Sequence, residues 1–127
     1  MNGKELSAWN LYPAVDAKDR ISFLKVLADD CLRAGKFEVA CMSFDALQDL
    51  DSNEDFVVGL KSSCIAVFRS AVMEKEKKRQ VSGKCKNALS KATSILQARF
   101  EARDLKNILP PMQKWMRSNV SMHDIHV

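Results

Sequence analysis

Apolar residues recur at spacings of three and four along most of this 127-residue chain. That spacing places side chains on one face of an α-helix, and no stretch alternates apolar and polar residues as a half-buried strand does. The pattern predicts helices over about residues 4–11, 17–34, 36–50, 53–80 and 84–109, with a last short turn in MQKWMRS. We therefore expect an all-α fold without a sheet.

Glycine and proline are few, and they fall where the predicted helices should end. Gly35 is expected to close the helix over 17–34, and Pro110-Pro111 to end the helix over 84–109. Ser52, with Asp55 three residues later, predicts a capping-box-like start for the helix over 53–80. Its apolar stripe runs to Met73, and the polar stretch EKEKKRQ that follows is expected to project into solvent or to fray.

The segment from residue 21 to 54 carries a recognisable pattern. Gly35 lies at its turn, Phe37 follows, and Ala40 and Phe44 form an A-x-x-x-F step. These residues resemble one tetratricopeptide repeat, or the closely similar pentatricopeptide hairpin. The first-helix positions of the repeat fall on Leu24, Leu27, Ala28 and Cys31. The resemblance implies antiparallel helical hairpins stacked as a right-handed α-solenoid; a small helical bundle is the alternative.

The match departs from the family pattern at three positions. Leu24 replaces an aromatic residue, Cys31 a tyrosine and Ser52 the closing proline. A shift of 34 residues, the period of the tetratricopeptide repeat, gives no second copy. We predict one helical domain over residues 1–120, which is a fragment of a longer solenoid or a short form of one, followed by a disordered tail over 121–127.

The resemblance implies a scaffold or adaptor, because such repeats bind a peptide or helix of another protein in a concave groove. The first helix of each hairpin lines that groove. The partner-binding residues predicted on this basis are Lys18, Ser22, Lys25, Asp29 and Arg33. A carboxylate clamp is not carried over, since Asp29 stands where an asparagine is wanted and would repel a carboxylate.

Charge is distributed unevenly. Residues 1–60 carry six Lys and Arg against eleven Asp and Glu, whereas residues 61–127 carry fourteen against five. A basic segment over 75–91 supports an alternative function in nucleic-acid binding or as a nuclear adaptor, although no aromatic residue that would stack on bases lies within it. The plainer interpretation is a solvated helix end. Its predicted basic patch comprises Lys75, Lys77, Lys78, Arg79, Lys84 and Lys86.

Trp115 lies near the end of the chain between Met112 and Met116. Two interpretations stay open for it: a core residue that covers neighbouring helices, or an exposed apolar patch that docks a partner or a second copy of the chain.

Catalysis finds little support in the sequence. No nucleophile has a histidine or paired carboxylate placed near it by a known motif, and no glycine-rich phosphate loop occurs. His123 and His126 have a spacing that binds a metal weakly when helical, but we expect only a frayed tail there. The four cysteines lack a C-x-x-C pair and are expected to be reduced, buried thiols. We predict no enzyme, cofactor or metal site.

The start of the chain does not read as a signal peptide, and no continuous apolar run approaches about 20 residues. We therefore predict a cytoplasmic or nuclear protein with no membrane association.

Overall fold

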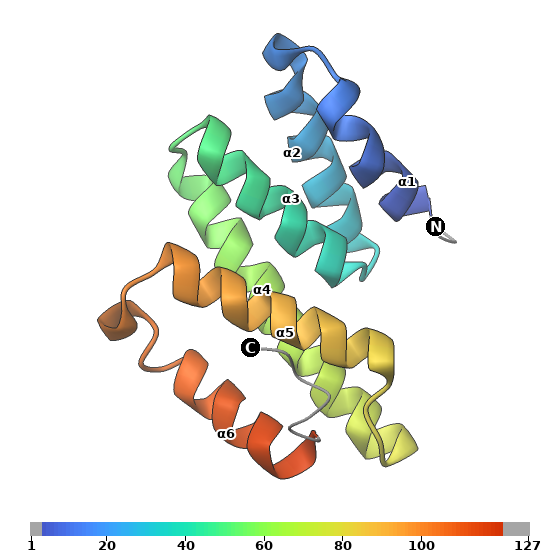
Figure 1. Ribbon diagram of the computed structural model, residues 1–127, viewed down its shortest axis with the longest axis vertical. Coiled ribbons are helices and arrows are strands. Elements are labelled where there is room, and N and C mark those ends of the chain that lie inside the picture. Colours follow the sequence, from blue (N-terminus) through green and yellow to red (C-terminus); the bar gives the residue numbers. More distant parts are fainter. Residues whose placement is uncertain (1–3, 121–127) are drawn as a thin grey trace. The chain divides into compact units, whose positions relative to one another are not determined.

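The computed structural model describes residues 4–120 and confirms the all-helical prediction for them, with α-helices, two 3₁₀ turns and no strand (Figure 1). The chain divides into two compact units, Met1–Ser63 and Cys64–Val127. Helix α4, Glu54–Lys78, begins in the first unit and ends in the second. The prediction of a single domain over 1–120 stays a prediction, and the predicted tail lies outside the described residues.

The first unit is built on an antiparallel hairpin of α2, Ala17–Arg33, and α3, Phe37–Leu50 (Figure 1). Helix α1, Lys4–Leu11, and the 3₁₀ turn Tyr12–Ala14 precede the hairpin, and α1 packs against both of its helices. Gly35 has a φ of 78°, in the left-handed region, as predicted for a residue that closes a helix. The backbone N–H of Lys36 then donates to the carbonyl of Cys31 at 2.8 Å and completes the turn.

Small residues let the helices of the first unit approach closely. Ala28 and Ala40 are fully buried on α2 and α3. Gly59, near the start of α4, lies against the ring of Phe44, and a Cβ atom added at Gly59 would come within 2.5 Å of that ring. The core of the hairpin contains Leu27, Cys31, Val39 and Ala40, with partly buried Ala8, Trp9, Phe23 and Leu32 packed against it.

The prediction that Ser52 caps the start of α4 is wrong. The side-chain oxygen of Asn53, one residue after Ser52, accepts the backbone N–H of Asp55 at 2.8 Å. Either residue type suits a helix cap, so composition alone did not separate them. Likewise, Asp16 stands at the N-cap of α2 as predicted, but its side chain makes no capping hydrogen bond.

The second unit contains the rest of α4, then α5, Gly83–Arg99, the 3₁₀ turn Ala102–Asp104, and α6, Leu109–Asn119. Helix α4 stays helical to Lys78, through most of the polar stretch, and Val81 beyond it is buried. The buried apolar residues of this unit are Cys64, Val67, Ala71, Val81, Leu89, Ala92, Leu96, Leu105, Met112, Met116 and Val120.

Two predictions about this region are wrong. Helix α5 ends at Arg99 rather than at Leu109, because the chain is extended at Phe100 and then forms a 3₁₀ turn. Pro110 and Pro111 do not end a helix; they lie in the first turn of α6. Proline suits that turn because its missing N–H would have no partner inside the helix and its fixed φ matches the helical value. The last short turn predicted in MQKWMRS is therefore a full helix.

The buried stripe of α2 recurs on α4 with a spacing that the predicted period misses. Thirty-six residues separate Leu24 from Leu60, Ala28 from Cys64 and Cys31 from Val67. All six side chains are at most 3% exposed. This spacing is two residues longer than the 34-residue period at which a second copy was sought.

Helix α4 is the one helix among residues 4–120 that is long and apolar enough to cross a membrane by length and composition. The sequence prediction concerned a continuous apolar run of about 20 residues, and Lys61 and Arg69 interrupt the apolar residues of α4. Core helices of soluble proteins share both properties, and 33% of the most apolar window of α4 is buried inside the structure. Length and composition therefore give only weak support to a membrane-spanning role.

Candidate functional site

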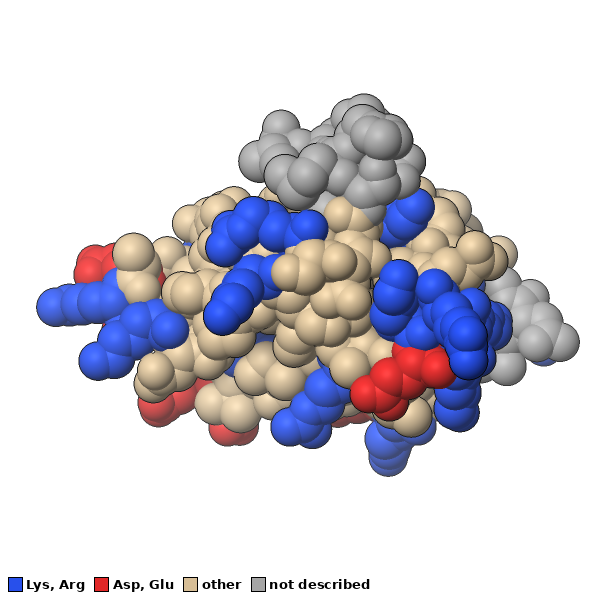
Figure 2. All heavy atoms as spheres, turned by 90° about the horizontal axis from the view of Figure 1, so that it is seen from below, with Lys and Arg blue, Asp and Glu red and all other residues tan. Residues whose placement is uncertain are grey.

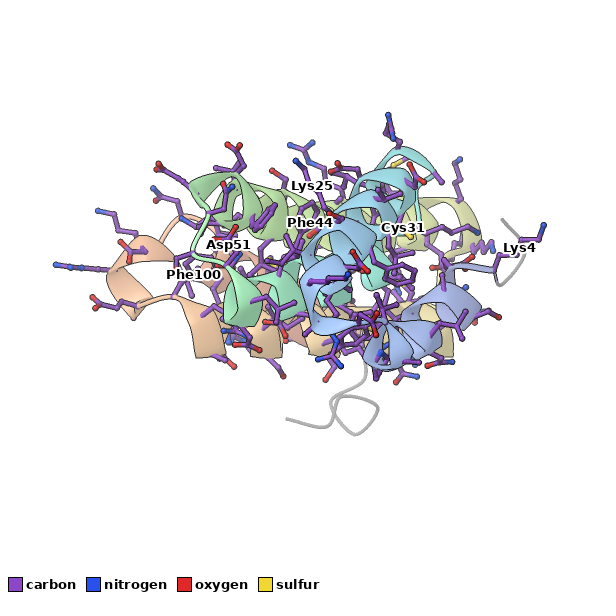
Figure 3. All side chains as sticks on the ribbon, turned by 90° about the horizontal axis from the view of Figure 1, so that it is seen from above. Lys4, Lys25, Cys31, Phe44, Asp51 and Phe100 are labelled. Atoms are coloured by element: carbon purple, nitrogen blue, oxygen red, sulfur yellow. The ribbon has the colours of Figure 1, made fainter. Side chains whose placement is uncertain are left out.

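The residues predicted to bind a partner lie on the exposed side of α2. Lys18, Ser22, Lys25, Asp29 and Arg33 are all exposed, whereas Cys31 on the same helix and Phe44 on α3 are buried (Figure 3). Their spacing of mostly three or four residues gathers them on one helix face. We call these five residues the α2 surface.

Charges of both signs characterise the α2 surface. The guanidinium of Arg33 donates to a carboxylate oxygen of Asp30 at 2.8 Å, and both side chains are at least half exposed. Such an exposed pair contributes little to stability. The arrangement suits recognition of a polar or mixed-charge segment better than recognition of a strongly acidic one.

Sequence reasoning missed one side chain on this face. Val26 is 61% exposed and lies four residues after Ser22 and three before Asp29. Val26 lies off the apolar stripe of α2, and this position in the sequence could have predicted that its side chain is exposed. An exposed apolar side chain among polar ones is a common feature of a contact surface, although single exposed apolar residues are also ordinary.

The predicted basic patch gathers around the connection between α4 and α5. Lys77, Lys78, Arg79 and Lys84 are exposed, and Lys75 and Lys86 are half-buried. Figure 2 shows Lys and Arg side chains clustered over this end of the second unit, around a smaller acidic area.

Glu74 ties the end of α4 to the start of α5. Its carboxylate accepts the backbone N–H of Ser82 at 3.1 Å and a hydrogen bond from Cys85. The hydroxyl oxygen of Ser82 accepts the backbone N–H of Cys85 at 3.2 Å and so caps α5. Partial burial disfavours ionisation of Glu74, but the hydrogen bonds and nearby Lys78 outweigh it and lower the pKa of the carboxyl below its ordinary value.

Trp115 is half-buried and packs within its own unit. Its ring meets the ring of Phe68 on α4 edge to face, with the ring centroids 5.5 Å apart. The backbone carbonyl of Trp115 accepts the side-chain N–H of Asn119 at 2.9 Å. The indole thus covers a neighbouring helix, as the core interpretation expects, and it keeps some exposed surface for which docking stays a prediction.

The thiols are poorly suited to nucleophilic chemistry. Burial, helped by nearby Glu5 and Asp30, raises the pKa of Cys31 to about 11. Burial, together with the hydrogen bond to Glu74 and its charge, raises the pKa of Cys85 to about 12. Both thiols therefore keep their protons at neutral pH, and a protonated thiol is a weak nucleophile. Cys41 and Cys64 are buried.

Within residues 4–120, no group of three or more potential ligands is arranged to hold a metal ion. His123 and His126, the histidine pair with metal-binding spacing, lie outside the described residues.

Comparison with known proteins gives one family match over nearly the whole chain. Residues 1–123 match the family described as "Intraflagellar transport protein 56". A protein of Caenorhabditis elegans described as "Intraflagellar transport protein 56 homolog" is 32% identical over 75 residues, which cover 58% of this chain. The aligned stretch is only 13% of the length of that relative. No solved structure matches the chain significantly.

Proposed function

This chain belongs to the intraflagellar transport protein 56 family, and on that premise we propose that it is a protein-interaction scaffold of intraflagellar transport. The family description concerns transport, not catalysis, and a scaffold without enzymatic activity agrees with it. The chain aligns with only a small part of its relative, so the function of the whole protein is part of this proposal.

The observation that carries the proposal is the repetition of one hairpin design. The α2–α3 hairpin buries Ala40 and Phe44, the A-x-x-x-F residues of the tetratricopeptide pattern. The buried stripe of its first helix then recurs on α4 after thirty-six residues. Helical hairpins that repeat one packing pattern form stacks whose extended surfaces bind other proteins. We infer that the two hairpins are diverged tetratricopeptide-like repeats.

The α2 surface is the proposed partner-binding site, because the first helix of each hairpin lines the groove in such stacks. A mixed-charge surface with exposed Val26 fits a peptide or helix of another transport protein. We propose the cilium and the cytoplasm as locations. The nuclear location expected from the basic segment has no support from the family match.

The test is a charge reversal on the α2 surface. The double variant Lys25→Glu, Arg33→Glu should reduce co-purification of other intraflagellar transport proteins from ciliated cells severalfold, because it reverses two exposed charges of the site. The matched control is Lys106→Glu, Lys114→Glu, which makes the same change in net charge at exposed positions of the second unit. Circular dichroism should show equal helicity in all three proteins.

Equal recovery of transport proteins with both variants would overturn the assignment of the α2 surface. Recovery of no transport protein with the unaltered chain would overturn the proposed function itself.

A further inference from the structure

The cations around the α4–α5 connection, four exposed and Lys75 half-buried, form a second surface that the scaffold function does not use. Its members are Lys75, Lys77, Lys78, Arg79 and Lys84, and we call them the basic turn. The described residues provide no ion pair for any of these five side chains. Lys78 nevertheless lies near enough to Glu74 to lower the pKa of that carboxyl.

Only two carboxylates lie in the sequence between residues 70 and 100, Glu74 and Glu76. Glu74 is occupied by the hydrogen bonds from Ser82 and Cys85 that close the turn. Five cations thus face two carboxylates, Glu74 and Glu76, and three positive charges remain in excess. Clustered charges of one sign produce a local potential that attracts segments of the opposite sign.

The backbone holds these cations in a defined arrangement. Arg79 adopts the left-handed conformation with a φ of 60°, and its N–H donates to the carbonyl of Lys75 at 2.8 Å. Val81 is 7% exposed and anchors the connection in the unit. The Ser82 cap fixes the start of α5. A turn secured at both ends loses less conformational freedom on binding than a flexible loop does.

We propose that the basic turn is a docking site for an acidic segment of a protein partner. The charge complementarity identifies the occupant as anionic. The assignment to a protein rests on the proposed scaffold function, whereas the site itself rests on the charges and the closed turn.

Two other anionic occupants fit the surface less well. Binding of single-stranded nucleic acid commonly uses aromatic rings on which bases stack, and no aromatic residue lies between Phe68 and Phe100. A membrane-surface site combines cations with a broad apolar face. Met73, 55% exposed, is the one large exposed apolar side chain recorded between residues 70 and 100.

The experiment measures fluorescence anisotropy of a fluorescein-labelled oligoglutamate peptide titrated with the full chain at low salt. The triple variant Lys77→Glu, Arg79→Glu, Lys84→Glu should bind at least about tenfold more weakly, since it reverses three charges of the site. The control is Lys4→Glu, Lys106→Glu, Lys114→Glu, which makes the same change in net charge at exposed positions. It should bind within about twofold of the unaltered chain if the site is local.

A milder variant, Lys77→Gln, Arg79→Gln, Lys84→Gln, keeps the test usable if the reversal unfolds the second unit, and it should show an intermediate loss. The proposal is overturned if the unaltered chain does not bind the peptide, or if the control loses as much affinity as the turn variant.

Two competitors test which class of anion binds to the basic turn. A single-stranded oligonucleotide of the same charge as the peptide should displace it less well than unlabelled peptide does. Phosphatidylcholine vesicles containing phosphatidylserine should also compete less well. Stronger competition by either one would assign the basic turn to nucleic acid or to a membrane and overturn a protein occupant. This outcome is separable from failure of the α2 surface, because the α2 double variant leaves the basic turn unchanged.

Discussion

The α2–α3 and α4–α5 connections both reverse the chain between two helices, but they do so by different means. At the first, Gly35 adopts a left-handed φ of 78° and the backbone supplies the closing hydrogen bonds. At the second, Arg79 adopts a φ of 60°, and the side chains of Glu74 and Ser82 secure the turn. One turn thus depends on a residue without a side chain, and the other on polar side chains.

The way in which each turn is closed affects the surface beside it, the α2 surface in one case and the basic turn in the other. Glycine adopts the left-handed conformation at no steric cost, so the connection beside the α2 surface needs no hydrogen bonds from side chains. A non-glycine residue in the left-handed region costs about 1–2 kcal/mol, which hydrogen bonds must offset. The second connection has this strained backbone conformation at Arg79. The polar network is therefore what allows the basic turn to carry a cation there.

The largest expected effect concerns the apolar cores to which α3 and α5 contribute, which should be equivalent. Leu47 on α3 and Leu96 on α5 are both fully buried. Changing either one to alanine should lower the free energy of unfolding by about 2–5 kcal/mol, since each change replaces a buried isobutyl side chain with a methyl group and leaves a cavity. Urea denaturation followed by circular dichroism measures the loss.

Leu50→Ala is the control for this pair, because Leu50 is 40% exposed and its truncation should cost much less. A cost below about 1 kcal/mol for Leu96→Ala alone would mean that the second hairpin is not packed like the first.

The helices of these cores were largely predictable from sequence. Apolar spacing of three and four gave α1 to α4 within about two residues of their ends, because burial of one helix face dominates the choice of apolar positions. Helix ends were less predictable. Pro110 and Pro111 fit either the end of one helix or the start of the next, and tertiary packing of Met112 and Met116 selects the second.

The candidate site was predictable in part. Exposure of the α2 surface follows from its position opposite the buried stripe, so its five residues could be chosen from sequence. Closure of the basic turn could not be anticipated, because the hydrogen bond from the Ser82 N–H to Glu74 depends on the backbone path of the turn between them. The recurrence of the α2 stripe on α4 was missed because α4 carries Cys64 and Val67 at these positions and the spacing is two residues longer than 34.

The two connections should respond in opposite directions to glycine exchange. Gly35→Ala should lower the free energy of unfolding by about 1 kcal/mol, because alanine is strained at positive φ. Arg79→Gly should raise it by about 0.5 kcal/mol, since relief of that strain exceeds the added freedom of the unfolded chain. Thermal denaturation of both variants measures the signs. Destabilisation by Arg79→Gly would show that contacts of the arginine side chain hold the turn, and the two connections would then not differ in backbone strain.

The smallest effect is a pH dependence confined to the second connection. The hydrogen bonds from Ser82 and Cys85, with Lys78, lower the pKa of Glu74 in the folded chain relative to its ordinary value of 4.5. The stabilisation by the carboxylate is therefore fully present above the unfolded pKa and is lost as the pH falls through the folded pKa. Cys85, with a pKa raised to about 12, keeps its proton and remains a donor throughout this range. Thermal midpoints of the unaltered chain and Glu74→Gln should differ most near neutral pH and converge below pH 4.5. A difference that stays constant across that range would mean that the charge of Glu74 does not secure the turn, and that its hydrogen-bonding geometry alone does.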